Sequence, residues 1–198
     1  MHLFCLIFDE YETLDLMGPV EFLARVPEVK ISYVSFDGGM KRSKQGFKIK
    51  TKKLSKMPKE SVLLLPGGQG TRALVNDSGF ISRLKECVLA SQFCLSVCTG
   101  SALIARTGEL DGLKATSNKR SLEWVKSCGE AVKWQERARW VRAGKFYTAS
   151  GVAAGMDMAL GFISDHFGKE LAQKIANETE YNWQKSSKID KFAKIYGY

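Results

Sequence analysis

The sequence is most informative at Val97-Cys98-Thr99-Gly100-Ser101, which separates an apolar run at 93–97 from a helix-like series of small residues at 102–107. This order predicts a strand, a sharp turn and a helix, a geometry that holds one side chain in a tight bend at the top of an α/β sheet. Here that side chain is the thiol of Cys98, and at a helix N-terminus we expect its thiolate form to be favoured. The alternative is a buried cysteine that packs as a small hydrophobe, but Gly100 and Ser101 suit a tight turn better than a strand interior.

Length and composition predict one domain. The chain has 198 residues, 44% of them hydrophobic, which is enough for one sizeable core and leaves little room for a second. We expect a single α/β domain at residues 1–183 and a lysine-rich tail at 184–198, with Phe192, Ile195 and Tyr196 spaced as anchors. No apolar run approaches the length of a membrane span, and nothing resembles a targeting segment. We therefore expect a cytoplasmic protein with no membrane partner.

The cysteines and the charge exclude other classes of protein. Five cysteines without a CxxC pair or a His/Cys ligand spacing argue against a disulfide scaffold and a metal site. The net charge is +9, and nine basic residues with no acidic one lie between Met40 and Glu60. They alternate with apolar residues, as in Phe47-Lys48-Ile49-Lys50, which predicts an edge hairpin. Because no nucleic-acid-binding motif accompanies this charge, we expect no specific nucleic-acid partner.

Short apolar runs alternate with helical patterns along the chain, which is typical of βαβ units. We expect a three-layer α/β/α sandwich with a mainly parallel sheet. Strands are expected at 3–8, 31–36, 61–65, 93–97, 112–116, 131–135 and 140–149, the last interrupted by a turn at 143–145. Helices are expected from Gly18 onward and at 79–91, 102–107, 120–127, 153–167 and 169–181.

A nucleophilic thiol needs a partner for its proton. The chain has two histidines: His2 begins the first strand, and His166 lies near a helix end, where a histidine cation is common. A papain-like mechanism is therefore not favoured. A carboxyl is the better candidate, because burial of Asp15 beside a thiol would raise its pKa and let it shuttle a proton. N-capping of the helix expected at Gly18 would explain Asp15 equally well, and Glu21 is a rival carboxylate whose other role would be to stabilise the first helical turn.

Gly67 and Gly68 follow another buried strand. In open α/β sheets, ligands gather at the carboxyl ends of the strands. The glycine N–H groups, together with the Thr99 amide, could form an oxyanion hole. A plain turn is the alternative interpretation.

Five motifs, in this order, resemble the ThiJ/PfpI superfamily, whose flavodoxin-like fold is that of the class I glutamine amidotransferase domain. They are Asp15-Leu16-Met17-Gly18-Pro19 with Glu21, Leu65-Pro66-Gly67-Gly68, Ser96-Val97-Cys98-Thr99-Gly100-Ser101, Gly108-Glu109-Leu110-Asp111-Gly112-Leu113-Lys114-Ala115-Thr116 and Gly151-Val152-Ala153-Ala154-Gly155-Met156-Asp157-Met158-Ala159-Leu160. The first and third are most similar to the isocyanide (isonitrile) hydratase branch.

The resemblance implies roles for named residues. Cys98 would be the nucleophile, Asp15 its acid partner and Thr99 a neighbouring hydrogen-bonding residue. We also expect Gly67, Gly68, Asn118 and Glu21 to bind the substrate. The resemblance also implies a homodimer with the site near the subunit interface, a small-molecule substrate and no cofactor. In an isocyanide hydratase, the thiolate would add to the isocyanide carbon, Asp15 would relay a proton, and water would release an N-substituted formamide.

The chain departs from this pattern after Ala115-Thr116. Relatives usually carry a histidine and an aromatic residue there, whereas this chain has Ser117-Asn118-Lys119. Asn118 can form hydrogen bonds but cannot take up a proton. The leading hypothesis is a cysteine-dependent hydratase or hydrolase acting on a small carbon–nitrogen substrate. The alternatives are a redox sensor that uses Cys98, an amidase or protease, and a regulatory ligand-binding domain.

Overall fold

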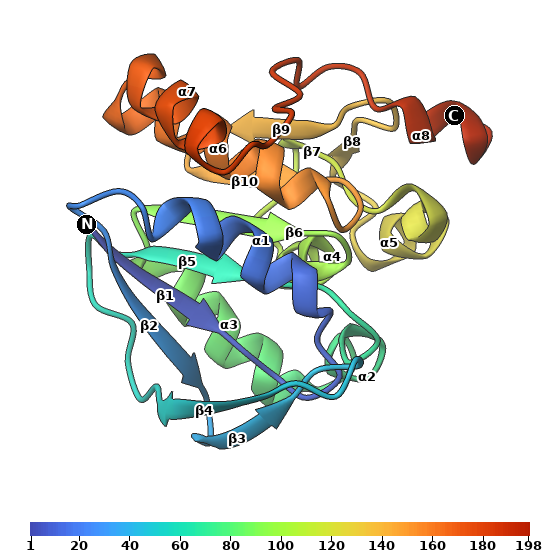
Figure 1. Ribbon diagram of the computed structural model, residues 1–198. Helices are drawn as coiled ribbons and strands as arrows, with labels where there is room; N and C mark the ends of the chain where they lie inside the picture. Colours follow the sequence, from blue (N-terminus) through green and yellow to red (C-terminus); the bar gives the residue numbers. More distant parts are fainter.

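The computed structural model describes residues 1–198 and is built around an eight-stranded sheet in the order β3-β4-β2-β1-β5-β6-β10-β9 (Figure 1). Its strands are β1 (His2–Leu6), β2 (Lys30–Ser35), β3 (Gly39–Arg42), β4 (Lys48–Lys53), β5 (Val62–Leu65), β6 (Phe93–Val97), β9 (Trp140–Ala143) and β10 (Phe146–Ala149). Only the edge pairs β3–β4 and β9–β10 are antiparallel. Two short strands, β7 (Lys114–Ala115) and β8 (Lys133–Trp134), form a separate ribbon. The predicted mainly parallel sheet is confirmed.

Helices cover both faces of this sheet. On one face α1 (Thr13–Leu23) packs against α6 (Ala154–Phe167), which in turn contacts α7 (Lys169–Glu178). On the other face α3 (Ser78–Ala90) contacts α4 (Gly100–Arg106), which also touches α2 (Thr71–Leu74) and α5 (Leu122–Cys128). A short 3-10 turn, η1 (Lys119–Ser121), precedes α5, and α8 (Lys191–Ile195) lies near the C-terminus. The three-layer α/β/α sandwich is confirmed.

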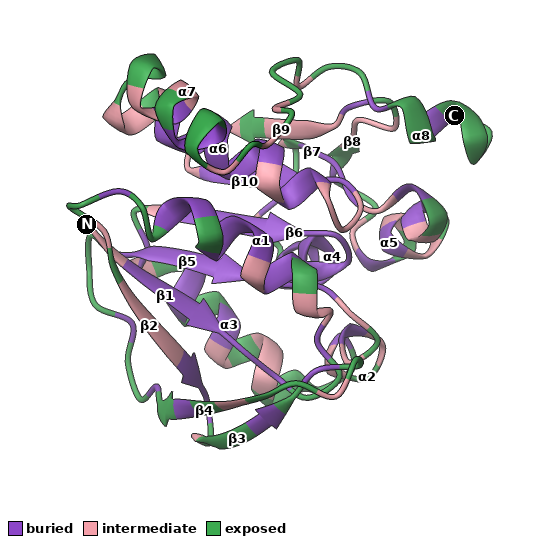
Figure 2. Ribbon diagram, in the orientation of Figure 1, coloured by how far each residue is buried: buried purple, intermediate pink, exposed green.

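The core surrounds the central strands. All four residues of β5 are buried, and so are the last four residues of β6 (Figure 2). A strand covered by helices on both faces needs no polar face, which explains the continuous apolar runs of these two segments. Each fully buried leucine or valine contributes about 1.5–3 kcal/mol relative to exposure. The carboxyl ends of these strands are therefore firmly positioned.

Helix α1 begins at Thr13, earlier than the sequence predicted, and Pro19 lies inside it. Proline lacks a backbone N–H and disfavours a helix interior, so the sequence suggested a helix start at Gly18. The apolar side of α1 packs against α6, and this contact extends the helix through the proline. Glu12 occupies the N-cap position and Asp15 lies on the buried side of the first turn. The interpretation of Asp15 as an N-cap is therefore wrong.

The basic stretch forms the predicted hairpin at one edge of the sheet. Strands β3 and β4 pair antiparallel, and Lys48, Lys50 and Lys52 are exposed along β4. Lys41 is the exception, because it is buried and its Nζ lies 2.6 Å from Asp37 Oδ2. The exposed lysines lie on β4, next to the free edge strand β3, where their charge opposes the approach of another chain.

The C-terminal segment 184–198 lies over the end of the molecule that carries β9. Its backbone is fixed to this end by the bonds from Arg139 N to Ser187 O (2.8 Å) and from Asp190 N to Arg137 O (2.7 Å). The predicted anchors do not serve as such, because Phe192, Ile195 and Tyr196 are 41%, 69% and 47% exposed. In this segment the buried side chains are those of Asp190 and Ala193, which are short.

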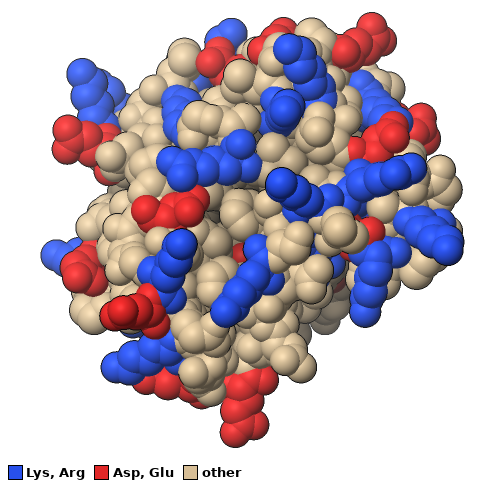
Figure 3. Space-filling model, turned by 90° about the horizontal axis from the view of Figure 1, so that it is seen from above, with Lys and Arg blue, Asp and Glu red and all other residues tan.

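On the face seen in Figure 3, basic side chains are interspersed with acidic ones.

None of the helices combines the length and the apolar character that a membrane span requires.

Candidate active site

Cys98 lies in the sharp bend between β6 and α4, as the sequence predicted. Its φ of +56° is in the left-handed region, a strained conformation for a residue with a side chain. Gly100 permits the bend, because a Cβ at this position would lie 2.6 Å from Leu65 O and 2.8 Å from Pro66 O. The Cys98 N–H donates to Ser150 O (2.9 Å), and Cys98 O accepts a bond from Ser117 Oγ (2.7 Å). These contacts fix the backbone of Cys98 at the carboxyl edge of β6 and β10.

Asp15 reaches the same point from α1. Its side chain is fully buried, and Oδ2 accepts a hydrogen bond from the Gly67 N–H at 3.0 Å. Oδ1 is buried without a hydrogen bond of good geometry, although the thiol of Cys98 is close enough to interact with this carboxyl. Burial raises the pKa of Asp15 well above its usual 3.8, and the Gly67 bond opposes this only in part. The carboxyl can therefore hold a proton beside the thiol.

The state of the Cys98 thiol differs from the sequence prediction. The position at a helix N-terminus suggested a favoured thiolate, but Cys98 is only 7% exposed. Burial first, and then the charge of Asp15, raise the pKa of Cys98 well above the usual 9.0, while the Thr99 N–H and hydroxyl lower it. Desolvation outweighs the N–H groups of the seven-residue helix α4. Burial therefore opposes the thiolate form that the position at a helix N-terminus was expected to favour.

Gly67 and Gly68 position the acid and Thr99 instead of forming a free oxyanion hole. The Gly67 N–H is used by Asp15, and the Gly68 N–H donates to Thr99 Oγ1 at 3.0 Å. A Cβ on Gly67 would lie 2.6 Å from Thr99 N and 2.9 Å from Asp15 Oδ2. Thr71 Oγ1 lies 3.1 Å from Thr99 Oγ1, so α2 also supports this residue. The sequence predicts that the N–H groups of Gly67 and Gly68 bind the substrate. This prediction is wrong, because Asp15 and Thr99 already accept hydrogen bonds from these two groups.

Two of the predicted carboxylate and amide residues lie outside this cluster. Glu21 is exposed on α1 and its Oε1 pairs with Arg25 Nη2 at 2.6 Å. Asn118 caps η1, since its Oδ1 accepts the Ser121 N–H at 3.1 Å. Its Nδ2 lies next to Gly151, where an added Cβ would come within 2.9 Å. Glu21 is therefore not part of the site, while Asn118 lies beside it.

Both histidines lie near the amino ends of the strands, whereas Cys98 follows a carboxyl end. His2 begins β1 and its Nε2 lies 2.9 Å from Ser32 Oγ. His166 packs against Phe93 at the start of β6, and its Nε2 lies 3.1 Å from the Tyr147 hydroxyl. Burial lowers the pKa of His166, which disfavours the cation that its place near a helix end suggested. Neither histidine can act on Cys98, which follows the far end of β6.

Arg72 is a residue of this region that the sequence did not single out. It comes from α2, its guanidinium stacks 3.5 Å from the centre of the Trp124 ring, and Nη2 donates to Ser121 Oγ at 3.2 Å. Burial lowers the pKa of Arg72, and the nearby Cys128 and Cys98 oppose this in part, so Arg72 and Cys98 are within electrostatic reach of each other. In the sequence, only the position of Arg72 shortly after Gly67 and Gly68 could have indicated that it lies near the site.

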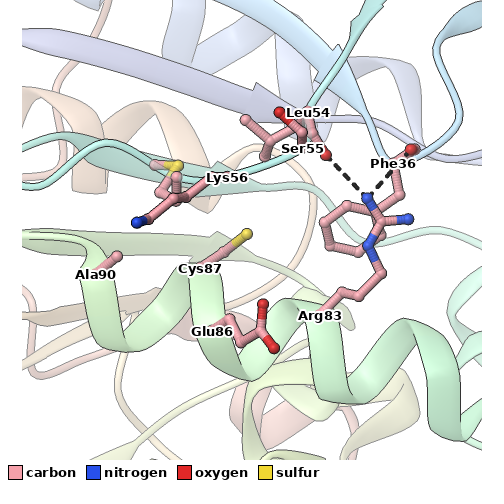
Figure 4. Close-up of a pocket in the computed structure, with 9 residues that line it drawn as sticks. Phe36, Leu54, Ser55, Lys56, Arg83, Glu86, Cys87 and Ala90 are labelled. Atoms are coloured by element: carbon pink, nitrogen blue, oxygen red, sulfur yellow. Dashed lines mark hydrogen bonds between the residues drawn. The ribbon is translucent and has the colours of Figure 1, made fainter.

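One cavity adjoins the Cys98 region and another lies apart from it. One of about 360 Å³ has Asn118, Ser150 and Gly151 in its wall, next to the backbone of Cys98. Another of about 380 Å³ lies between α3 and the segment after β4 (Figure 4). There, Arg83 donates to Phe36 O and Leu54 O, and burial raises the pKa of the Cys87 thiol to about 11. This second cavity is separate from the Cys98–Asp15 pair. No group of three or more His, Cys, Asp or Glu side chains is placed to hold a metal ion.

A strained cysteine at a strand-to-helix bend of a three-layer sandwich, with a buried acid against it, defines an α/β protein of the nucleophile-elbow type. The chain belongs to the DJ-1/PfpI family, whose model matches residues 1–165.

Individual relatives support this assignment. The chain is 30% identical to the isonitrile hydratase of Pseudomonas putida over 177 residues, which cover 89% of this chain and 76% of the hydratase. It is similar to the crystal structure of a THiJ/PfpI family protein from Pseudomonas syringae, with a TM-score of 0.83, 27% identity and coverage of 91% of this chain and 75% of that chain. Oxidized DJ-1 of Toxoplasma gondii has a TM-score of 0.73 and 19% identity, with coverage of 92% and 98%. The last comparison concerns the fold alone.

Proposed function

We propose that this protein is a cysteine-dependent hydratase that converts a small isocyanide to an N-substituted formamide. The observation that carries the proposal is the buried Asp15 carboxyl: the Cys98 thiol is close enough to interact with it, its Oδ1 has no other partner, and burial raises its pKa. The identity with an isonitrile hydratase supports this choice among carbon–nitrogen substrates.

The first chemical step joins the thiol to the substrate. Cys98 Sγ attacks the terminal carbon of the isocyanide, and a C–S bond forms. The thiol proton passes through Asp15 Oδ1 to the same carbon, which gives a thioimidate with a C=N bond. No net charge is created in the site, which suits a pair whose burial disfavours ions. The Gly67 N–H keeps Asp15 Oδ2 in place throughout this step.

The second step releases the product. Water adds to the thioimidate carbon and gives one proton to the nitrogen through Asp15. The resulting tetrahedral intermediate collapses, the C–S bond breaks, and the oxygen of the water becomes the formamide carbonyl. The remaining water proton returns to Sγ. The sum is one isocyanide plus one water to one N-substituted formamide, and the Thr99 N–H and hydroxyl stabilise sulfur when it carries negative charge.

The same geometry favours this function over the alternatives. A redox-sensing cysteine is expected to be exposed and to have a low pKa, whereas Cys98 is buried and its pKa is raised. A cysteine amidase or protease commonly uses a histidine base, and His2 and His166 lie near the amino ends of the strands, away from Cys98.

Formamide formation from phenyl isocyanide tests the proposal. We expect turnover by the wild type, none by Cys98→Ala, and normal turnover by Cys87→Ala, which removes a buried thiol from the separate cavity of Figure 4. Circular dichroism checks that both variants fold. Equal turnover by wild type and Cys98→Ala would show that the thiol is not the nucleophile. The homodimer is part of the proposal, and light scattering after gel filtration should give twice the chain mass of 22.1 kDa.

A further inference from the structure

The cavity of about 360 Å³ beside Cys98 has a wall that suits a ligand of particular chemistry. It lies between the segment 118–120, the segment 150–153 and the C-terminal segment. Its volume falls in the range of small-molecule sites. Ser150 lines the cavity, and its carbonyl accepts the backbone N–H of Cys98 at 2.9 Å, so the cavity adjoins the backbone of the nucleophilic residue. A substrate whose reactive carbon lies at Cys98 could therefore place its remaining atoms here.

The wall is cationic. Lys119, Arg120 and Arg139 line the cavity, and Asp190 is the one acid among its lining residues. Arg139 is already balanced, since its Nε donates to Asp157 Oδ2 at 2.9 Å and its Nη1 lies 3.6 Å from Asp190 Oδ1. The other two cations have no carboxylate within ion-pair distance. A positive charge therefore remains on this wall.

Lys119 is the more unusual of the two uncompensated cations. It is 3% exposed, and its Nζ donates to Thr116 Oγ1 (2.7 Å) and Ala138 O (2.7 Å), both uncharged acceptors. Burial lowers its pKa to about 8. Asp190 and Glu136 oppose this lowering only in part, and neither forms an ion pair with Lys119. A buried charge that is incompletely compensated is destabilising, and an anion in the adjoining cavity would reduce that cost.

Two guanidinium groups add positive charge to this region: Arg120 lines the cavity, whereas Arg72 lies outside its wall and is connected to it through its hydrogen bond to Ser121. Arg120 is exposed and makes neither an ion pair nor a side-chain hydrogen bond, so its donors are free. Arg72, held by Ser121 and Trp124, also has no carboxylate partner. Free guanidinium donors match the two oxygens of a carboxylate.

The rest of the wall is apolar. Val152 and Ala153 line one side, and Phe192 and Tyr196 of the C-terminal segment line another. Phe192 and Tyr196 are partly exposed, and part of their ring surface faces this cavity. An aromatic or aliphatic ligand body would bury that surface, which is favourable by about 25 cal/mol for each Å².

We propose that the substrate of this site carries a carboxylate on an apolar body, and that Arg120, Lys119 and the C-terminal segment select for it. This inference rests on the proposed function, because it treats the cavity as the place for the part of the substrate distant from Cys98. The carboxylate binds toward Arg120, and the apolar body lies against Phe192 and Tyr196.

Turnover of a matched substrate pair tests the selection. The probes are 4-isocyanobenzoate and its neutral methyl ester. We expect kcat/KM to favour the carboxylate by about tenfold or more in the wild type, as for a hydrogen bond between charged groups. Arg120→Gln should lose most of that preference and Lys119→Met should do the same, while Arg25→Gln, an exposed arginine paired with Glu21, should keep it. Arg120 is exposed, so its variant remains informative if Lys119→Met fails to fold.

A binding measurement separates this inference from the proposed reaction. Calorimetry on Cys98→Ala compares 4-formamidobenzoate with its methyl ester at low and high salt. Tighter binding of the acid, weakened by salt and by Arg120→Gln, supports the carboxylate site even if no isocyanide is turned over. Equal binding of acid and ester, together with equal kcat/KM values, overturns the inference and leaves the hydratase function standing.

Discussion

The substitution Asp15→Asn tests the state of the buried acid. Asparagine has nearly the same shape, and its oxygen can accept the Gly67 N–H bond that Asp15 Oδ2 now accepts at 3.0 Å. The change removes the transferable proton and little else. We therefore expect a folded variant whose turnover falls by about 10²–10⁴-fold, the usual contribution of a positioned acid–base group. We also expect it to be more stable than the wild type at neutral pH.

The size of the stability gain follows from the raised pKa. Below the usual pKa of 3.8, Asp15 is protonated in both the folded and the unfolded chain. The charge of Asp15 should then cause no difference in the free energy of unfolding between the wild type and Asp15→Asn. Above it, the unfolded chain loses the proton while the folded protein keeps it, so wild-type stability falls by about 1.4 kcal/mol per pH unit until the folded pKa is passed. For a chain of this length, that slope corresponds to about 3–6 °C in Tm per pH unit.

Thermal unfolding of both proteins between pH 3 and pH 8 measures this difference. The gain of Asp15→Asn over the wild type should be near zero at the acid end and should grow with pH. Glu21→Gln is the matched control, because Glu21 is an acid of the same helix that is exposed and paired only with Arg25; it should change stability by less than about 1 kcal/mol. A gain that does not depend on pH would refute the argument that burial raises the pKa of Asp15.

Three further outcomes follow from the geometry. Gly67→Ala should abolish turnover and destabilise the fold by about 1–3 kcal/mol, because its Cβ would lie 2.6 Å from Thr99 N; Gly79→Ala, in the open first turn of α3, should do neither. Alkylation of Cys98 by iodoacetamide should keep accelerating above pH 9, as the raised thiol pKa requires, and a rate that levels off below pH 8 would contradict it. Asp190→Ala should make the C-terminal segment more sensitive to limited proteolysis, since Asp190 is its buried polar contact; unchanged cleavage would show that other bonds suffice.

The strand-to-helix bend could be predicted from the sequence because its determinants are local. An apolar run, a cysteine and Gly100 lie within a few residues of one another, and β6 has the predicted bounds. The layered α/β fold could also be predicted, since it follows from the alternation of apolar runs with helical patterns. The candidate acid Asp15 could be singled out, but its role as cap or buried partner could not be decided until α1 was placed.

Other features depend on contacts between distant segments. The pKa of Cys98 is set by burial, which local sequence does not show, and the N–H groups of Gly67 and Gly68 are taken by residues of α1 and α4. Arg72 reaches this region only because α2 packs against α4. Hydrophobicity predicts Phe192, Ile195 and Tyr196 as the anchors of the C-terminal segment, whereas Asp190 holds it through its bond with Arg137, in a loop about fifty residues earlier.

A covalent adduct on Cys98 is the most direct test of the central claim, that this thiol and Asp15 together add to an isocyanide. Wild-type protein is mixed with phenyl isocyanide, quenched in acid within milliseconds to seconds, and mapped by peptide mass spectrometry. The account predicts a transient increase by the mass of one isocyanide on the peptide that contains Cys98, which decays as formamide appears and is absent from Asp15→Asn. Formamide production without any adduct, or with an adduct on another cysteine, would contradict it.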